Sequence, residues 1–172
     1  MDAEKFTKKS LEVIESCEKL AYEYNNQELT QAHLMYALVT IEDSLVAKLL
    51  TNMGINMDAF TGECEKLVAN RPKVSGGQLF TSPEFSKALI QAEKEAKQMG
   101  DDYISVEHIF LGLLEKADKD IKRVINAYGI TRGKFLQVLA NIRGNRKVES
   151  DNPEDTYDAL NKYGYNLVER AR

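Results

Sequence analysis

The 172-residue sequence has two cysteines, two histidines and no long apolar run. A membrane helix needs about 20 consecutive apolar residues, and the polar start, Met1–Lys5, lacks the apolar stretch of a signal peptide. Cys17 and Cys64 form no CxxC motif and occupy apolar helix positions, which predicts reduced thiols in the core. These absences predict a cytoplasmic protein that neither spans nor binds a membrane.

Short motifs that would name a reaction are missing as well. The sequence contains no Walker-type glycine loop, no GxGxxG, no GxSxG, no HExxH and no paired-cysteine metal site. The net charge of -4 argues against nucleic acid as a partner, because phosphate binding needs a clustered positive surface. We therefore expect a chain without catalysis, cofactor or metal of its own.

What the sequence does contain is an internal repeat, in which the segments Leu29–Val39 and Ile104–Leu114 share one design. In each segment a hydroxyl residue able to cap a helix precedes a histidine by three positions, and an apolar run follows. The two segments are 75 positions apart, and this offset pairs further residues: Glu18 with Glu93, Ala21 with Ala96, Leu38 with Leu113, Gly54 with Gly129, and Phe60 with Phe135. Because the matches fall at caps, helix ends and core positions, they predict two copies of one helical unit.

Helical periodicity predicts four helices in each copy. The expected helices of the first copy are Lys5–Tyr24, Thr30–Ile41, one from Ser44 to before Gly54, and one from Asn56 to before Pro72. In the second copy, Ser82 caps a helix with Pro83 at its first position, and helix ends are expected at about Gly100, at about Lys116, before Gly129 and before Gly144. No alternating pattern is long enough to predict a strand. The expected fold is all-α, with two four-helix repeats related by a pseudo-two-fold axis.

Composition marks the expected domain boundaries. The connector Arg71–Gly77 contains a proline and paired glycines, so residues 1–76 form the first repeat with its connector and 77–145 form the second. The polar segment 146–155 is predicted to be a flexible linker. A final helix over 156–172 would place Tyr157, Leu160, Tyr163, Leu167 and Ala171 on one face. That face has no partner in the remaining chain, so we expect it to belong to a further, truncated domain.

The only two histidines, His33 and His108, occupy equivalent positions, and two interpretations of them remain open. As structural residues, each would hydrogen-bond near the cap of its helix, which is the interpretation that we favour. As metal ligands, they would have to converge across the repeat interface and recruit carboxylates.

Residues near the helix starts are the candidates for a binding surface. Thr7 and Ser82 are equivalent hydroxyls, whereas Glu107 stands where the first copy has Ala32. With Asp101 and Asp102, Glu107 predicts an acidic rim on the second copy. The acids could serve only to complement a positive helix end, worth about 0.3–1 kcal/mol. In the functional interpretation the rim accepts basic or extended peptide segments and selects against acidic ones.

Several of these motifs together resemble the double Clp N-terminal repeat of the ClpB and ClpC chaperone ATPases. They are Phe6-Thr7, the two histidine segments, Ala92–Lys97 and Tyr103–His108, and the resemblance covers about residues 4–145. The tail, Asn152–Gly164 with Leu167–Arg172, is similar to the lead-in to the first ATPase module of the ClpB branch, placed here at 156–172. The resemblance implies a compact eight-helix domain on a mobile linker.

The resemblance to the ClpB branch also implies site residues. A threonine and two acids that affect substrate handling in ClpB relatives match Thr7, Asp101 and Glu107. Leucines that line a groove in some relatives correspond to Gln91, Glu95 and His108, which argues against a strongly apolar groove in this chain.

The ClpC branch adds a second implied site, a pocket for phosphorylated arginine built from a hydroxyl and a glutamate. Ser82 with Glu107 keeps that pair, whereas Thr7 is expected to face Ala32. At most one such pocket is therefore expected.

The implied function is recognition of unfolded or aggregated polypeptide, which the domain delivers to the hexameric AAA+ motor of an ATP-dependent disaggregase. The alternative is a docking domain for a folded adaptor in a ClpC-type, protease-coupled unfoldase. This chain is expected to be monomeric and free of cofactors. The full-length protein is expected to be hexameric and to use ATP and Mg²⁺.

Overall fold

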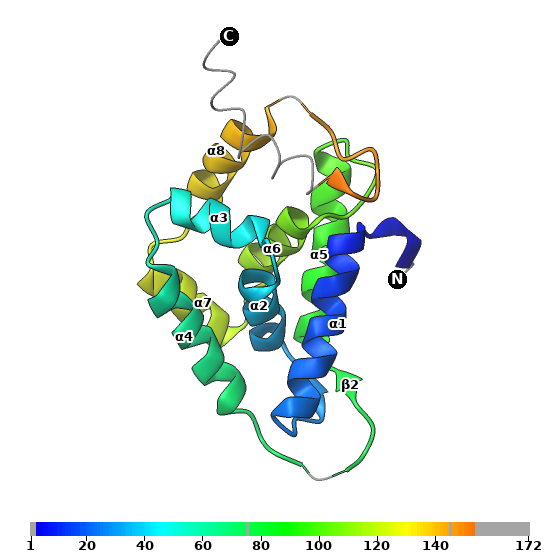
Figure 1. The fold of residues 1–172 in the computed structure, drawn as a ribbon, viewed down its shortest axis with the longest axis vertical. Helices are drawn as coiled ribbons and strands as arrows, with labels where there is room; N and C mark the ends of the chain where they lie inside the picture. Colours follow the sequence, from blue (N-terminus) through cyan, green and yellow to red (C-terminus); the bar gives the residue numbers. More distant parts are fainter. Residues whose placement is uncertain (1–2, 75, 145, 154–172) are drawn as a thin grey trace.

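The computed structural model describes residues 3–74, 76–144 and 146–153, and this part of the chain contains eight α-helices (Figure 1). The first repeat consists of α1 (Lys8–Glu23), α2 (Gln31–Thr40), α3 (Leu45–Asn52) and α4 (Met57–Ala69). The second consists of α5 (Pro83–Gln98), α6 (Val106–Glu115), α7 (Lys119–Ala127) and α8 (Arg132–Arg143). The predicted all-α fold and its division into two four-helix repeats are confirmed. The predicted final helix over 156–172 lies outside the described residues.

Side-chain caps explain why the helices start where they do. The first backbone N–H groups of a helix have no partner within it, and a side-chain oxygen just before the helix satisfies one of them. Oγ1 of Thr7, Oγ of Ser82 and Oδ1 of Asn56 accept such bonds at the starts of α1, α5 and α4. The predicted caps at Ser82 and Asn56 are therefore confirmed.

The start of the chain differs from the prediction. Residues Ala3–Lys5 form a short 3-10 helix, and Phe6 is extended, so α1 begins only at Lys8 and not at Lys5. Phe6 forms a parallel bridge to Ile104, which leads into α6. This tertiary pairing prevents α1 from extending toward the N-terminus.

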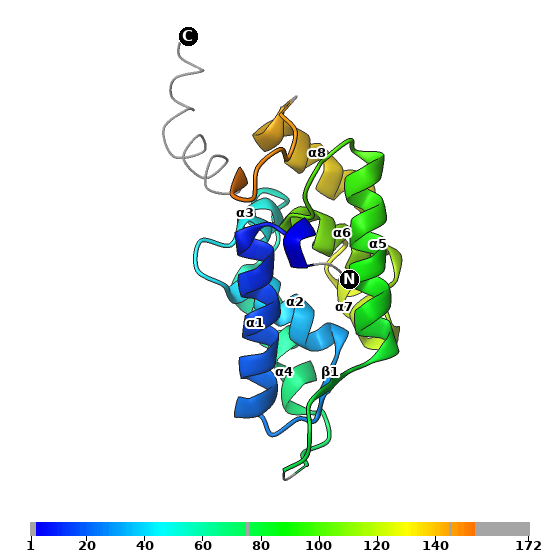
Figure 2. The same ribbon diagram turned by 90° about the vertical axis from the view of Figure 1, so that its right-hand side faces the viewer.

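Two short strands, β1 (Glu28–Leu29) and β2 (Phe80–Thr81), pair in parallel and correct the expectation of no strand. Leu29 pairs with Thr81 just as Ile104 pairs with Phe6, and each of these residues has its equivalent in the other pair. Figure 2 shows β1 beside the segment that leads into α5. The segment before the first helix of each repeat therefore pairs with the segment before the second helix of the other repeat. We call this arrangement the crosswise pairing, and it follows the pseudo-two-fold symmetry.

The helices α2 and α6 form the centre of the domain (Figures 1 and 2). They carry large fully buried side chains, including Leu34, Met35, Leu38, Ile109, Phe110, Leu111 and Leu113. Burying such side chains contributes roughly 1.5–3 kcal/mol each. Cys17 and Cys64 are buried and free, which confirms the prediction of reduced core thiols.

The segment after α8 lies on the domain as far as Pro153, and we call residues 146–153 the strap. Val148 is completely buried within it, and its carbonyl accepts from the N–H of Asp102 at 2.8 Å. The carbonyl of Asp151 accepts from the N–H of Lys8 at 2.8 Å, at the start of α1. The described part of the predicted linker thus makes specific contacts with both repeats.

Candidate functional site

The histidine of the first repeat completes the cap of α2. The N–H of Thr30 donates to Nδ1 of His33 at 3.0 Å, so Nδ1 is an acceptor and the ring proton lies on Nε2. Nε2 donates in turn to Oδ1 of Asn26 at 2.8 Å. Burial and the positive charge of Arg71 lower the pKa of His33 from 6.5 to about 4, so the ring is neutral at pH 7.

The second repeat builds the same cap with a carboxylate in place of the amide. The N–H of Ser105 donates to Nδ1 of His108 at 2.9 Å, and Nε2 donates to Oδ2 of Asp101 at 2.8 Å. Both nitrogens of each histidine ring are thus occupied, and the structural interpretation of the histidines is confirmed. Neither ring has a nitrogen left to share a metal ion across the repeats.

Asp101 joins three separate parts of the second repeat. Its Oδ1 accepts from Nη2 of Arg143, at the end of α8, and from the N–H of Val148 in the strap at 3.0 Å. Burial alone would raise the pKa of Asp101, but the hydrogen bonds from His108 and Arg143 hold it below its usual value. The carboxylate therefore stays charged and ties the strap to α8 and α6.

Glu107 is completely buried beside this network. Nη1 of Arg143 lies 3.7 Å from its Oε2, and neither carboxylate oxygen has a hydrogen-bond partner within the described part of the chain. Asp101 is buried too, and only Asp102 of the three predicted rim acids is exposed. The predicted acidic rim is therefore wrong as a description of the surface, because Arg143 draws two of its acids into the interior.

Backbone hydrogen bonds show which segments the hydroxyls Thr7 and Ser82 lie beside. The N–H of Thr7 donates to the carbonyl of Ile104, whereas the N–H of Ser82 donates to the carbonyl of Leu29. The crosswise pairing therefore places Thr7, and not Ser82, beside the segment that leads to Glu107. The side chains of Thr7 and Ser82 are buried caps.

A polar cluster occupies the positions that correspond to the groove leucines. Glu95 is only 2% exposed, and its two oxygens accept from Nη2 and Nη1 of Arg132 at 2.6 and 2.9 Å. Gln91 donates to the same carboxylate at 3.0 Å. Burial alone would raise the pKa of Glu95, but the hydrogen bond from Arg132 holds it below its usual value. His108, the third position, is buried in its own network.

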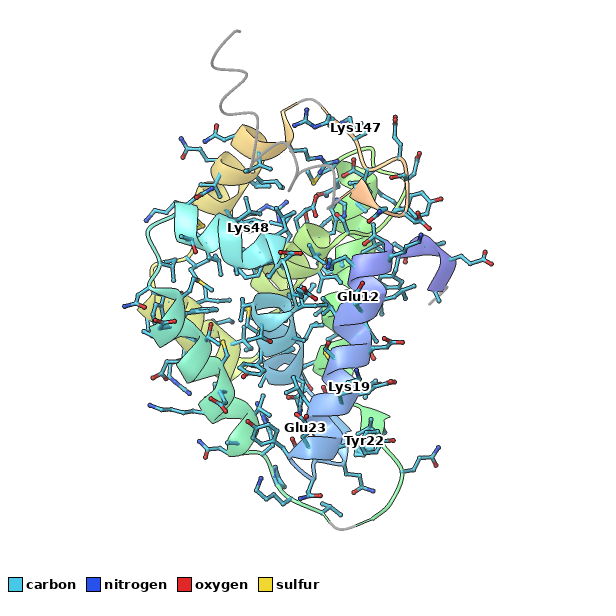
Figure 3. The ribbon with its side chains drawn as sticks, viewed as in Figure 1. Glu12, Lys19, Tyr22, Glu23, Lys48 and Lys147 are labelled. Atoms are coloured by element: carbon cyan, nitrogen blue, oxygen red, sulfur yellow. The ribbon has the colours of Figure 1, made fainter. Side chains whose placement is uncertain are left out.

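One turn further along α5 and α8, a cleft of about 500 Å³ opens between the two helices and the start of the strap. We call it the α5–α8 cleft. Its apolar lining consists of Met99, Leu136, Leu139 and Ala140, and its cationic lining consists of Arg143, Arg146 and Lys147, with Gln98 and Gly144 completing the wall. Figure 3 shows Lys147 at the opposite end of the molecule from Tyr22 and Glu23. An open cleft of this size that combines apolar and polar side chains can hold a ligand.

Exposed apolar side chains gather at that opposite end. Tyr22, Val74 and Phe80 are 68%, 41% and 50% exposed, and they line two smaller hollows of about 170 and 100 Å³. Both hollows are much smaller than the α5–α8 cleft of about 500 Å³. The α5–α8 cleft is therefore the stronger candidate site.

Two residues that organise the candidate site, Arg132 and Arg143, were missed at the sequence level. Both stand where the first repeat has apolar residues, Met57 and Val68. An arginine at an otherwise apolar repeat position is a signal for a buried carboxylate partner, because buried charges are paired. Alignment of the two repeats at the 75-residue offset would have revealed both arginines.

Within residues 3–74, 76–144 and 146–153, no group of three or more His, Cys, Asp or Glu side chains is arranged to hold a metal ion. None of the helices described there is long and apolar enough to cross a membrane.

Comparison with known proteins shows the family to which the sequence is similar. Residues 5–128 match the model of the Clp repeat (R) N-terminal domain. The chain is 43% identical over 178 residues to the chaperone protein ClpB of Nitratidesulfovibrio vulgaris, a match that covers 100% of this chain and 21% of that protein. The chain therefore spans about a fifth of the length of this relative.

Solved structures agree in fold. The Hsp104 N-terminal domain from Candida albicans superimposes with a TM-score of 0.77 at 20% identity, over 87% of this chain and 99% of that one. A ClpV N-domain in complex with a VipB peptide superimposes with a TM-score of 0.64 at 19% identity, over 79% and 85% of the two chains. At these identities the likeness concerns the fold alone.

Proposed function

Because this chain belongs to the Clp repeat (R) N-terminal domain family, we propose that it recognises unfolded or aggregated polypeptide for the AAA+ motor of a ClpB-type disaggregase. The domain itself has no catalytic role in this proposal. ATP, Mg²⁺ and hexamer formation belong to the motor of a full-length protein that acts in the cytoplasm. The ClpB relative supports this assignment, since its match extends over the whole of this chain.

The single observation that carries the proposal is the α5–α8 cleft. Its apolar residues Met99 and Leu136 are partly exposed, and a bound apolar side chain would gain about 25 cal/mol for each Å² that it removes from water. The thioether of Met99 suits varied side chains, because methionine is flexible and polarisable. Such contacts are weak individually, and a hexamer would strengthen them through effective concentration.

An amide-NMR titration with an unfolded client, and with the same client folded, tests this function. We expect the unfolded form alone to shift the resonances of Met99, Leu136, Ala140 and Lys147. Ala140 is exposed on α8, so Ala140→Tyr should fill the cleft and weaken binding at least fivefold without unfolding the domain. Ala59→Tyr, at an exposed position on α4, is the matched control and should bind as the wild type does.

Two outcomes would contradict the proposal. Tight one-to-one binding of a folded protein without binding of the unfolded client would favour the adaptor-docking function. Shifts confined to the surroundings of Thr7, Asp101 and Glu107 would move the site to the family positions and away from the cleft.

A further inference from the structure

We propose that the α5–α8 cleft selects polypeptide segments in which an apolar side chain is flanked by carboxylates. This inference rests on the proposed function and gives it a substrate class. It is opposite in sign to the preference for basic segments that the sequence suggests. The difference arises because the acids of the second repeat are buried, whereas the cations beside them reach the cleft.

The charge of the cleft comes from its wall. Three of the nine lining residues are cationic and none carries a carboxylate. Arg143 is committed to the buried carboxylates of Asp101 and Glu107, so it adds little net charge. Arg146 and Lys147 are exposed and face the cleft from the first residues of the strap.

The simplest alternative is that these two cations only complement helix ends. Nη2 of Arg146 donates to the carbonyl of Ile142 at 2.9 Å, and Nζ of Lys147 donates to the carbonyl of Met99 at 2.7 Å, at the ends of α8 and α5. A helix C-terminus carries about half a negative charge, so two ends offset about one of the two positive charges. A positive charge remains, and each cation keeps further N–H donors for a ligand.

The occupant follows from the combination of this charge with the apolar lining. Side chains of Leu or Phe fit against Leu136, Leu139 and Met99, while a neighbouring Asp or Glu can accept from Arg146 or Lys147. Exposed carboxylates nearby, Asp102 and Glu149, are not part of the lining and would repel a ligand only from outside the cleft. Extended client segments of mixed acidic and apolar composition are therefore the expected ligands.

In the described part of the first repeat, the hollow at the equivalent place is smaller and differently charged. The hollow after α4 measures about 170 Å³, and Glu28 stands in its wall with Arg71. Nη2 of Arg71 is also paired with Asp120 at 3.3 Å. We therefore expect selection for carboxylates at the α5–α8 cleft and not at this hollow.

Fluorescence anisotropy with three labelled peptides of equal length and equal Leu and Phe content tests the inference. The peptides differ only in their flanking residues, which are Glu, Gln or Lys. At low salt we expect the Glu peptide to bind about tenfold more tightly than the Lys peptide, with the Gln peptide between them. The difference should shrink as salt rises to about 0.5 M, because exposed charges are screened.

Charge reversal at the cleft gives the decisive comparison. Arg146→Glu with Lys147→Glu should invert the order of the three peptides. Lys66→Glu with Lys73→Glu makes the same change in net charge at exposed positions in and after α4, and it should leave the order unchanged. Circular dichroism of both double variants checks that they keep the helical fold.

The results separate the inference from the proposed function. If the unfolded client and the peptides bind the cleft but the wild type shows no preference for Glu, or if reversal of Arg146 and Lys147 leaves the order unchanged, the inference is wrong and the proposed function stands. If neither client nor peptide binds the wild type, both are wrong.

Discussion

The two repeats place different chemistry on the same frame. Where the first repeat has Asn26, Ala32 and Val68, the second has Asp101, Glu107 and Arg143, each 75 positions later. All three residues of the second set are buried, and they form one ionic cluster. The same helical frame therefore accepts either a neutral or an ionic interior beside its histidine cap.

This difference indicates that the four-helix frame does not by itself require an ionic cluster at these positions. Desolvating a buried ion costs several kcal/mol, and mutual attraction often does no more than offset this cost. The cluster instead connects the start of α6, the end of α8 and the strap through Asp101. In the first repeat, the equivalent amide of Asn26 donates to the carbonyl of Pro72 at 3.2 Å, which is a weaker neutral contact.

Of the changes considered, removal of Arg143 should lower the free energy of unfolding most. Arg143→Val leaves the carboxylates of Asp101 and Glu107 buried without their cation, and we expect a loss of about 3–5 kcal/mol in the free energy of unfolding. Urea denaturation followed by circular dichroism measures it.

The matched variant copies the whole first-repeat set into the second repeat. Asp101→Asn, Glu107→Ala and Arg143→Val together remove both the charges and their need for partners, so the triple variant should be within about 1–2 kcal/mol of the wild type. A triple variant as unstable as Arg143→Val alone would show that the cluster stabilises the fold after all.

Helix packing gives the second contrast. A Cβ added to Gly112 would lie 2.3 Å from the carbonyl oxygen of Ala88, so α5 and α6 touch through their backbones. The first repeat has Ala37 at the equivalent position. We expect Gly112→Ala to cost about 3 kcal/mol through overpacking and Ala37→Gly to cost only about 1 kcal/mol. Thermal or urea unfolding of both variants checks this, and equal effects would mean that the two helix pairs pack alike.

The histidine caps give an effect that depends on pH. The pKa of His33 is about 4 in the folded chain and about 6.5 when unfolded, so the unfolded state binds the proton more readily. The stability that neutral His33 contributes is complete above pH 6.5 and is lost as pH falls toward 4. Between pH 7 and pH 5 we expect this residue to cost about 2 kcal/mol.

Asn26→Asp tests the difference between the two histidine caps, because it gives His33 the carboxylate partner that His108 has. A carboxylate at that position favours the protonated ring, so the pKa of His33 should rise and the loss of stability between pH 7 and pH 5 should shrink. Titration of the His33 ring resonances by NMR measures the pKa directly. An unchanged pKa of His33 in Asn26→Asp would show that burial and Arg71 set it, whatever its hydrogen-bond partner.

Local signals in the sequence predicted the eight helices, although not the start of α1. Ser82 and Asn56 cap helices as predicted, and Gly54, Gly129 and Gly144 follow helix ends with positive φ, where glycine has no steric cost. Such signals act within a few residues and can be recognised without knowledge of the tertiary structure.

The candidate site depends on contacts between residues that are distant in the sequence. Such contacts could not be predicted from the sequence alone. Glu107 seemed exposed because its partner, Arg143, lies two helices away on α8. The position of Thr7 beside the segment that leads into α6 could not be predicted, because neither Phe6 nor Ile104 carries a strand pattern that would predict their pairing. The charge of a residue and the local sequence pattern do not show which distant residues it will contact.

The crosswise pairing also sets the order in which the domain can form during synthesis. Phe6 and Thr7 leave the ribosome early, yet their partner Ile104 follows only after roughly a hundred further residues, and closing so long a loop is entropically costly. Leu29 likewise waits for Thr81. Neither repeat can therefore finish folding before the other has been made, and the long-range pairing of the two chain segments should set the folding rate.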